Sequence, residues 1–140
     1  MENINQLNAF TREQYHDIWV RINAGSLLDE EEQVIGELMK QHKEFYKDWD
    51  STDFDYEYDI DTEVNPFMHI SLDSIVVNQI NSNNPKQTRF TYNKLRARGD
   101  SHLEAIHKIA SVIAENIWDV MKYGKEFNEK KYIQKLKHLR

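Results

Sequence analysis

The scarcity of turn-forming residues is the feature that most constrains the fold of this chain. Its 140 residues include only four glycines and two prolines. An all-β fold needs many Gly- and Pro-rich turns, whereas a helical fold needs few breaks. Three of the glycines, Gly25, Gly99 and Gly124, follow helical patterns, where glycine commonly ends a helix. The sequence therefore predicts an all-α fold.

Helix-start motifs place about six helices along the chain. Thr11-Arg12-Glu13-Gln14 and Ser101-His102-Leu103-Glu104 have the pattern of capping boxes, and Asn65-Pro66 places proline at a first helical position. With apolar residues at helical spacing, these starts predict helices over 12–22, 30–48, 66–81, 85–98, 101–123 and 126–139. We expect a compact bundle with the helices at 66–81 and 101–123 packed centrally.

Length and composition predict one domain over residues 1–140. The chain is 39% apolar and 30% charged, which is enough to build a single packed core. The N-terminus lacks the pattern of a signal peptide, and no apolar run approaches the length of a membrane span. The absence of cysteine removes disulfides and thiolate sites, which is compatible with the cytoplasm. We therefore expect a cytoplasmic protein without a membrane segment.

Charge is distributed unevenly between the two ends. Residues 1–64 hold 17 Asp/Glu and 5 Lys/Arg, whereas residues 122–140 hold 2 and 7. In the acidic segment 48–64, carboxylates alternate with aromatic residues, which resembles a strand, but no partner strand is evident. A calcium loop would need a glycine at its turn, and the segment has none. We predict an irregular segment that packs its aromatic rings on the helices and exposes its acids.

Two motifs place histidine and carboxylate side chains at helical spacing. His69 and Asp73 are about 40° apart around one helix, close enough to share a cation or to bond each other. His107 lies about 80° from the centre of the apolar stripe of its own helix, so the two histidines could meet if the helices pack antiparallel. Glu104 and His107 have the Glu-x-x-His spacing of di-iron bundles. The candidate metal ligands are His69, Asp73, His107 and Glu104, and the ion is zinc or iron.

Structural roles compete with these metal-ligand roles. Glu104 completes the capping box that begins at Ser101 and lies about 140° from the apolar centre of its helix. A lone histidine beside a core is often hydrogen-bonded structure. A full di-iron site also needs the Glu-x-x-His motif twice, and this chain has it once. His42 and Glu115 are further candidates for the missing ligands.

Several motifs spread over most of the chain carry a family resemblance. They are Asn65-Pro66-Phe67-x-His69, Arg98-Gly99-Asp100-x-His102, Glu104-Ala105-x-His107, Glu115-x-x-Trp118 and Tyr132-x-x-x-Leu136. With Trp19 and His42-x-Glu44-Phe45-Tyr46, they resemble an uncharacterised bacterial family of small all-α proteins, the domain of unknown function numbered 1841. In that family the motif at His69 tends to continue to a second histidine four residues on, where this chain has Asp73. The resemblance implies an extent and a fold, and no activity.

Two kinds of function fit these patterns. The first is a non-catalytic interaction or assembly module that binds a protein partner or itself, including a homodimer through the oppositely charged ends. The second is a helical metal-binding protein, or a metal-dependent enzyme, that uses the histidine and carboxylate cluster. The overall acidity argues against nucleic acid as a partner. Glycine-rich phosphate loops and Gly-flanked serine nucleophiles are absent from the sequence, so neither P-loop nor serine-hydrolase chemistry is expected.

Overall fold

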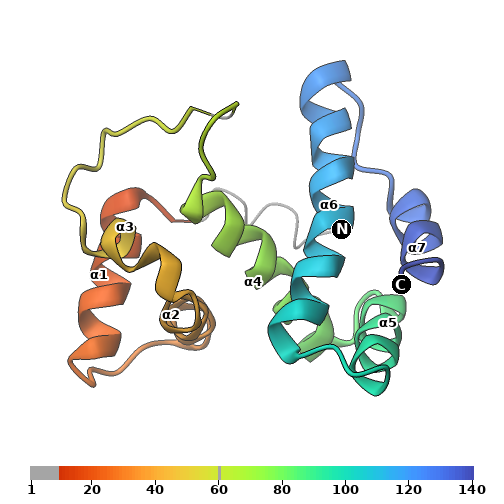
Figure 1. Ribbon diagram of the computed structural model, residues 1–140, viewed down its shortest axis with the longest axis horizontal. Coiled ribbons are helices and arrows are strands. Elements are labelled where there is room, and N and C mark those ends of the chain that lie inside the picture. Colours follow the sequence, from red (N-terminus) through yellow and green to blue (C-terminus); the bar gives the residue numbers. More distant parts are fainter. Residues whose placement is uncertain (1–9, 60) are drawn as a thin grey trace. The chain divides into compact units, whose positions relative to one another are not determined.

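The computed structural model describes residues 10–59 and 61–140, and within these residues all the regular structure is helical. The described residues contain seven α-helices and one 3₁₀ turn, and no strand (Figure 1). In chain order they are α1 (Arg12–Asn23), α2 (Glu30–Gln41), η2 (Lys43–Phe45), α3 (Tyr46–Asp50), α4 (Pro66–Ser82), α5 (Lys86–Ala97), α6 (His102–Tyr123) and α7 (Glu129–Lys137). The prediction of an all-α fold is confirmed.

The number of helices differs from the expected six because the helix predicted over 30–48 is broken. It ends at Gln41, the backbone leaves the helical region at His42 (φ −107°, ψ 74°), and the chain continues through η2 into α3. The carbonyls at the end of α2 are satisfied by other groups. The His42 ring donates to the Leu38 carbonyl at 2.7 Å, and the indole of Trp49 donates to the Met39 carbonyl at 3.0 Å. These side-chain bonds replace the helical ones, so the apolar pattern continues where the helix does not.

Local capping sets most of the helix boundaries. The side chains of Thr11, Asp29 and Ser101 each accept a hydrogen bond from the backbone N–H of the third residue of the following helix. The side chain of that third residue in turn accepts from the backbone N–H of the capping residue. Asn65 caps α4 by accepting from two backbone N–H groups at 3.0 and 3.2 Å. Gly124 ends α6 in the left-handed conformation (φ 66°). The sequence motifs therefore fix these ends directly.

Contacts divide the described chain into two compact units, the first ending at Ser74 and the second running from Ile75 to Arg140. Helix α4 is continuous across this division. The single domain and the central packing of two helices, both expected from the sequence, stay predictions.

The N-terminal unit packs α1 against α2 and α3. Its core combines aliphatic and aromatic side chains, namely Tyr15, Ile18, Trp19, Ile35, Leu38, Met39, Trp49, Phe67 and Ile70. Gly36 lies in the middle of α2, where glycine is otherwise unfavourable, because a Cβ there would meet the Ile22 side chain at 2.5 Å. The close approach of α1 to α2 explains this glycine.

The C-terminal unit packs α5, α6 and α7 against one another. A buried polar contact links three of its elements. The Gln79 carbonyl oxygen on α4 accepts from the Tyr132 hydroxyl at 2.8 Å and from the Thr88 hydroxyl at 2.7 Å. Around it lie buried aliphatic residues, among them Leu95, Ile106, Ile109, Ile113 and Leu136.

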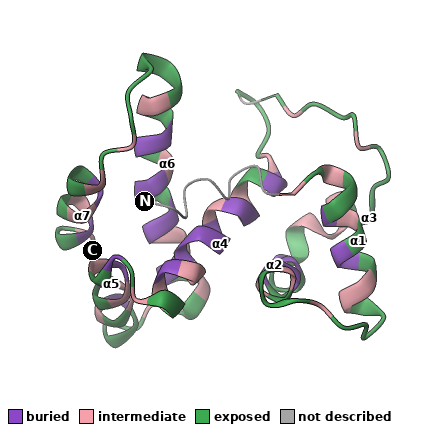
Figure 2. Cartoon of the chain, turned by 180° about the vertical axis from the view of Figure 1, so that it is seen from behind, coloured by how far each residue is buried: buried purple, intermediate pink, exposed green. Residues whose placement is uncertain are grey.

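The acidic segment between α3 and α4 has no helix or strand in its described residues and is largely exposed (Figure 2). Phe54 and Tyr58 are half-buried against the N-terminal unit, whereas Tyr56 is 44% exposed. The Arg12 guanidinium lies over the Tyr58 ring and donates to the Tyr56 carbonyl, while the Tyr58 hydroxyl donates to Asp48 at 2.8 Å. The predicted packing of aromatic rings beneath exposed acids is therefore observed for Phe54 and Tyr58 but not for Tyr56, and residues 48–50 belong to α3 and not to the irregular segment predicted over 48–64. None of the described helices is both long enough and apolar enough to cross a membrane.

Candidate metal centre

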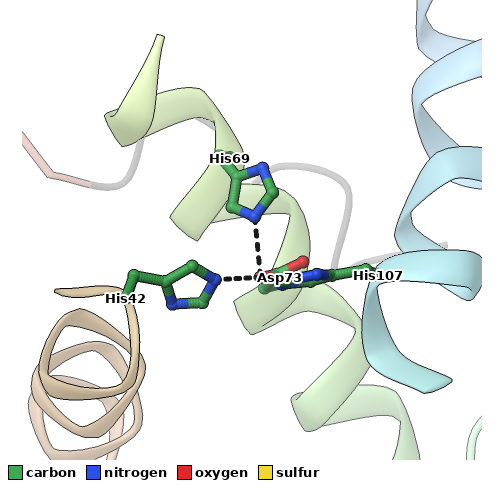
Figure 3. Close-up of side chains that lie close together, drawn as sticks. All are labelled: His42, His69, Asp73 and His107. Carbon is green, nitrogen blue, oxygen red and sulfur yellow. Dashed lines mark ion pairs between the residues drawn. The ribbon is translucent and has the colours of Figure 1, made fainter. Parts of the chain in front are cut away.

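The predicted pair on α4 lies in the N-terminal unit with both side chains turned to the same point (Figure 3). His69 Nε2 is 3.4 Å from Asp73 Oδ2, across one turn of the helix. Asn65 and Pro66 set where α4 begins, and the spacing of four residues then brings the two groups to one face. The proximity expected from the sequence is therefore observed.

His42 contributes a third group to this cluster from the break after α2. Its Nε2 atom is also 3.4 Å from Asp73 Oδ2, so two imidazoles approach the same carboxylate oxygen. The side chains of His42 and Asp73 are each 1% exposed, whereas that of His69 is 31% exposed. The cluster is thus buried on the side of His42 and accessible on the side of His69.

The tautomer of His42 follows from its second nitrogen. Nδ1 lies 2.7 Å from the Leu38 carbonyl, and a carbonyl can only accept, so Nδ1 carries the proton. In the neutral ring, Nε2 therefore presents its lone pair toward Asp73 and His69. An imidazole held through one nitrogen by a backbone carbonyl is the arrangement in which the other nitrogen binds metal ions.

Phe45 fixes the orientation of both imidazoles. Its ring stacks on His42 at 5.9 Å between centroids, with 5° between the planes, and meets His69 edge-on at 5.6 Å. The two imidazoles are themselves 5.0 Å apart in an edge-on arrangement. Both rings are therefore constrained by packing as well as by the carboxylate, which favours a preformed site.

The separations within the cluster fit ligands around one ion. Two ligands about 2.05 Å from a tetrahedral zinc ion are about 3.3 Å apart, whereas a charge-assisted N–H···O⁻ bond is about 2.7–2.9 Å long. Both nitrogen-to-oxygen separations are 3.4 Å, and one ligand atom from each of His42, His69 and Asp73 lies within 4.8 Å of the others. Small rotations of the rings would bring all three atoms to one cation.

The electrostatics of the cluster are dominated by the buried carboxylate. Burial alone would lower the pKa of His42, but the contact with Asp73 and the bond to the Leu38 carbonyl outweigh burial, so its pKa lies above the ordinary value. A carboxylate with this little exposure needs a positive charge nearby. That charge is supplied either by an imidazolium or by a bound cation.

The other predicted residues have different surroundings. Glu104 is exposed, and its carboxylate accepts from the Ser101 backbone N–H at 3.0 Å, which is the capping role that its spacing also predicted. That backbone bond holds the pKa of Glu104 below its usual value. His102 Nδ1 lies 2.7 Å from the Tyr92 hydroxyl, and Glu115 pairs with Lys135.

His107, also drawn in Figure 3, lies half-buried on α6 in the C-terminal unit. Its role as a ligand stays a prediction. From the sequence, His42 was only a further candidate ligand. The pattern that pointed to it was its position on the apolar stripe of a helix, aligned with Leu38 and Met39, but the sequence did not show that the helix would end there.

Comparisons with known proteins place the chain without assigning an activity. A family model described as Domain of unknown function (DUF1841) matches residues 8–138, which is nearly the whole chain. Neither the curated proteins nor the solved structures contain a match. The chemistry of the side chains must therefore carry any functional assignment.

Proposed function

Since the chain belongs to the DUF1841 family, whose description assigns no activity, we propose from its side chains that it binds a divalent transition-metal ion. His42 and His69 supply imidazole nitrogens, and Asp73 supplies a carboxylate oxygen. The observation that carries the proposal is the pair of equal 3.4 Å separations from two imidazole nitrogens to one buried carboxylate oxygen.

The ligand types favour zinc or iron(II). Magnesium and calcium prefer sites built from oxygen alone, whereas two imidazoles and one carboxylate are common ligands of zinc and of non-haem iron. Three protein ligands leave coordination positions for water or a substrate. A metal ion held in this way can lower the pKa of a bound water or polarise a substrate, so metal-dependent catalysis remains compatible with the proposal.

We extend the proposal to His107 as a fourth ligand. The support comes from the sequence, which places His107 on the shoulder of the apolar stripe of α6, and from chemistry, since a third imidazole would complete a four-ligand set for zinc. Glu104 is left out because its carboxylate caps α6. A four-ligand site would be closed and structural, and a three-ligand site would be open to exchange.

Metal content measured on protein made without a histidine tag tests the proposal. We expect one zinc or iron ion per chain in the wild type and loss of that ion in His42→Ala/His69→Ala, because each substitution removes a ligand. His102→Ala is the matched control, since that ring bonds Tyr92 instead. Equal metal in the wild type and the double variant would reject the proposal. His107→Ala then separates the closed site from the open one by whether zinc affinity falls.

An interaction or assembly role is a second candidate, and it was the first prediction from the sequence. The observation that favours it is a group of exposed apolar side chains, Trp118, Met121 and Tyr123, at the end of α6. Salt-dependent sedimentation of the full chain tests self-association. The cytoplasmic location and bacterial origin expected from the sequence stay predictions.

A further inference from the structure

The end of α6 exposes three large apolar side chains within six residues. Trp118 is 56% exposed, Met121 73% and Tyr123 61%, although the same helix buries a continuous apolar face earlier in its length. Figure 2 shows the last turn of α6 as exposed. Large apolar side chains gathered at the surface mark interaction sites more often than scattered ones do.

Two lysines lie over these rings. Lys122 Nζ is 5.9 Å from the centre of the Trp118 ring and 5.5 Å from that of Tyr123, and Lys125 Nζ is 5.6 Å from the Tyr123 ring. Together with Met121 these residues form what we call the lysine-aromatic surface. Cations held over aromatic faces keep their charge outward while their stems cover apolar area.

The lysines of this surface differ from their neighbours on α7. Lys131 and Lys135 are paired with Asp119 and Glu115. Within the described chain, no carboxylate forms an ion pair with either lysine of the lysine-aromatic surface. The charge there is therefore available for a carboxylate from elsewhere.

A groove adjoins this surface. It has a volume of about 630 Å³, and Trp118 forms one wall, with Ser111, Ala114, Glu115, Asp119 and Lys135 lining the rest. The carboxylates that line the groove, Glu115 and Asp119, are paired with Lys135 and Lys131. The positive charge of the lysine-aromatic surface beside the groove therefore suits a partner that offers both carboxylates and an aromatic side chain.

Residues 51–63, the part of the acidic segment between the end of α3 and the start of α4, offer those two kinds of group. They contain six carboxylates and no basic residue. All six acids are exposed, and so is Tyr56, whereas Phe54 and Tyr58 are half-buried. The half-buried rings of Phe54 and Tyr58 hold the segment against its own unit, and its acids face solvent.

We propose that two copies of this chain pair, with the acidic segment of each seated on the lysine-aromatic surface of the other. The inference rests on the proposed interaction role and is independent of the metal centre. Each copy carries both surfaces, so a two-fold pair satisfies both contacts in each copy and closes without further growth. Exposed charge pairs are screened by salt, with a Debye length of about 10 Å at 0.1 M, so the pair dissociates as salt rises.

Charge reversal on the full chain tests the proposal by sedimentation velocity. One variant is Lys122→Glu/Lys125→Glu and the other is Asp55→Lys/Glu57→Lys, both at exposed positions. Each alone places like charges across the contact. A mixture of the two restores opposite charges at both contacts, so we expect each variant to be monomeric and the mixture to form a heterodimer. Lys130→Glu/Lys137→Glu, on exposed positions of α7, is the control with the same change of net charge.

The wild type should dimerise at about 50 mM salt, and the affinity of the dimer should fall about tenfold or more by about 500 mM, as expected for screened charges. Dimers that survive both reversals would overturn the inference, as would a mixture that stays monomeric. A wild type that is monomeric at every salt concentration overturns it too. If that monomer binds a single-stranded oligonucleotide or phosphatidylserine vesicles through Lys122 and Lys125, the interaction role stands with another partner. If it binds neither, the interaction role also fails.

Discussion

Replacing Asp73 by asparagine should abolish metal-dependent stabilisation while preserving the shape of the cluster. The side chain is 1% exposed, and its Oδ2 faces both His42 and His69 at 3.4 Å. Asparagine keeps the volume but removes the negative charge that attracts a cation and an imidazolium alike.

The magnitude follows from two opposing effects in the metal-free protein. Removing one partner of a buried charge pair costs about 3–5 kcal/mol. Asparagine also removes the cost of burying a carboxylate, so the net loss should fall to about 1–3 kcal/mol. A metal ion at a hundred times its dissociation constant adds about 2.7 kcal/mol to the wild type, which is about 10 °C in melting temperature for a chain of this size.

Thermal denaturation with added zinc and with a chelator measures both quantities. We expect the wild type to melt about 10 °C higher with zinc than with chelator, and Asp73→Asn to melt at the same temperature in both. Asp100→Asn is the control, because that carboxylate pairs with Lys108 in the other unit. A zinc-induced shift of the same size in wild type and Asp73→Asn would refute the reasoning. A wild type that zinc does not stabilise would leave a purely structural histidine–aspartate cluster.

Three further predictions concern pH, the cap of α6 and the polar contact in the C-terminal unit. Because the pKa of His42 is raised on folding, the metal-free protein binds that proton more tightly when folded. The stabilisation that protonated His42 contributes is full below the ordinary histidine pKa and is lost as the pH rises through the raised pKa. Urea denaturation at a series of pH values across this range should show the free energy of unfolding decline, and His42→Gln should flatten that decline. Ser101→Ala removes the cap of α6 and should lower the free energy of unfolding by about 1 kcal/mol. Neither Ser101→Ala nor Glu104→Ala should change the metal content. Loss of metal in Glu104→Ala would instead identify Glu104 as a ligand. Tyr132→Phe removes a buried 2.8 Å bond to Gln79 and should cost about 1–2 kcal/mol in urea denaturation; an unchanged midpoint would show that the hydroxyl contributes nothing net.

Helix boundaries were predictable where a cap lies within one turn of the group that it satisfies. Thr11, Asn65 and Ser101 each cap a helix that begins where the motif predicts. The pairing of His69 with Asp73 was predictable for the same reason, since four residues of helix determine their separation.

The break at His42 shows where such local reasoning ends. The apolar stripe continues through that residue, so periodicity alone predicts an unbroken helix to residue 48. The break depends on the His42 ring bonding the Leu38 carbonyl and on the Trp49 indole bonding the Met39 carbonyl. Each of these bonds forms because the rings pack inside the N-terminal unit, which the local pattern does not describe.

The sequence by itself therefore determined the all-α class, the capped helix starts and one pair of potential ligands on α4. Only the tertiary structure decided that the helix predicted over 30–48 ends at Gln41 and that His42 joins that pair. The physical reason is one of distance along the chain. A cap or a spacing of four residues is fixed by the geometry of one helical turn, whereas Asp73 meets His42 only through the packing that holds α2, η2 and α4 together.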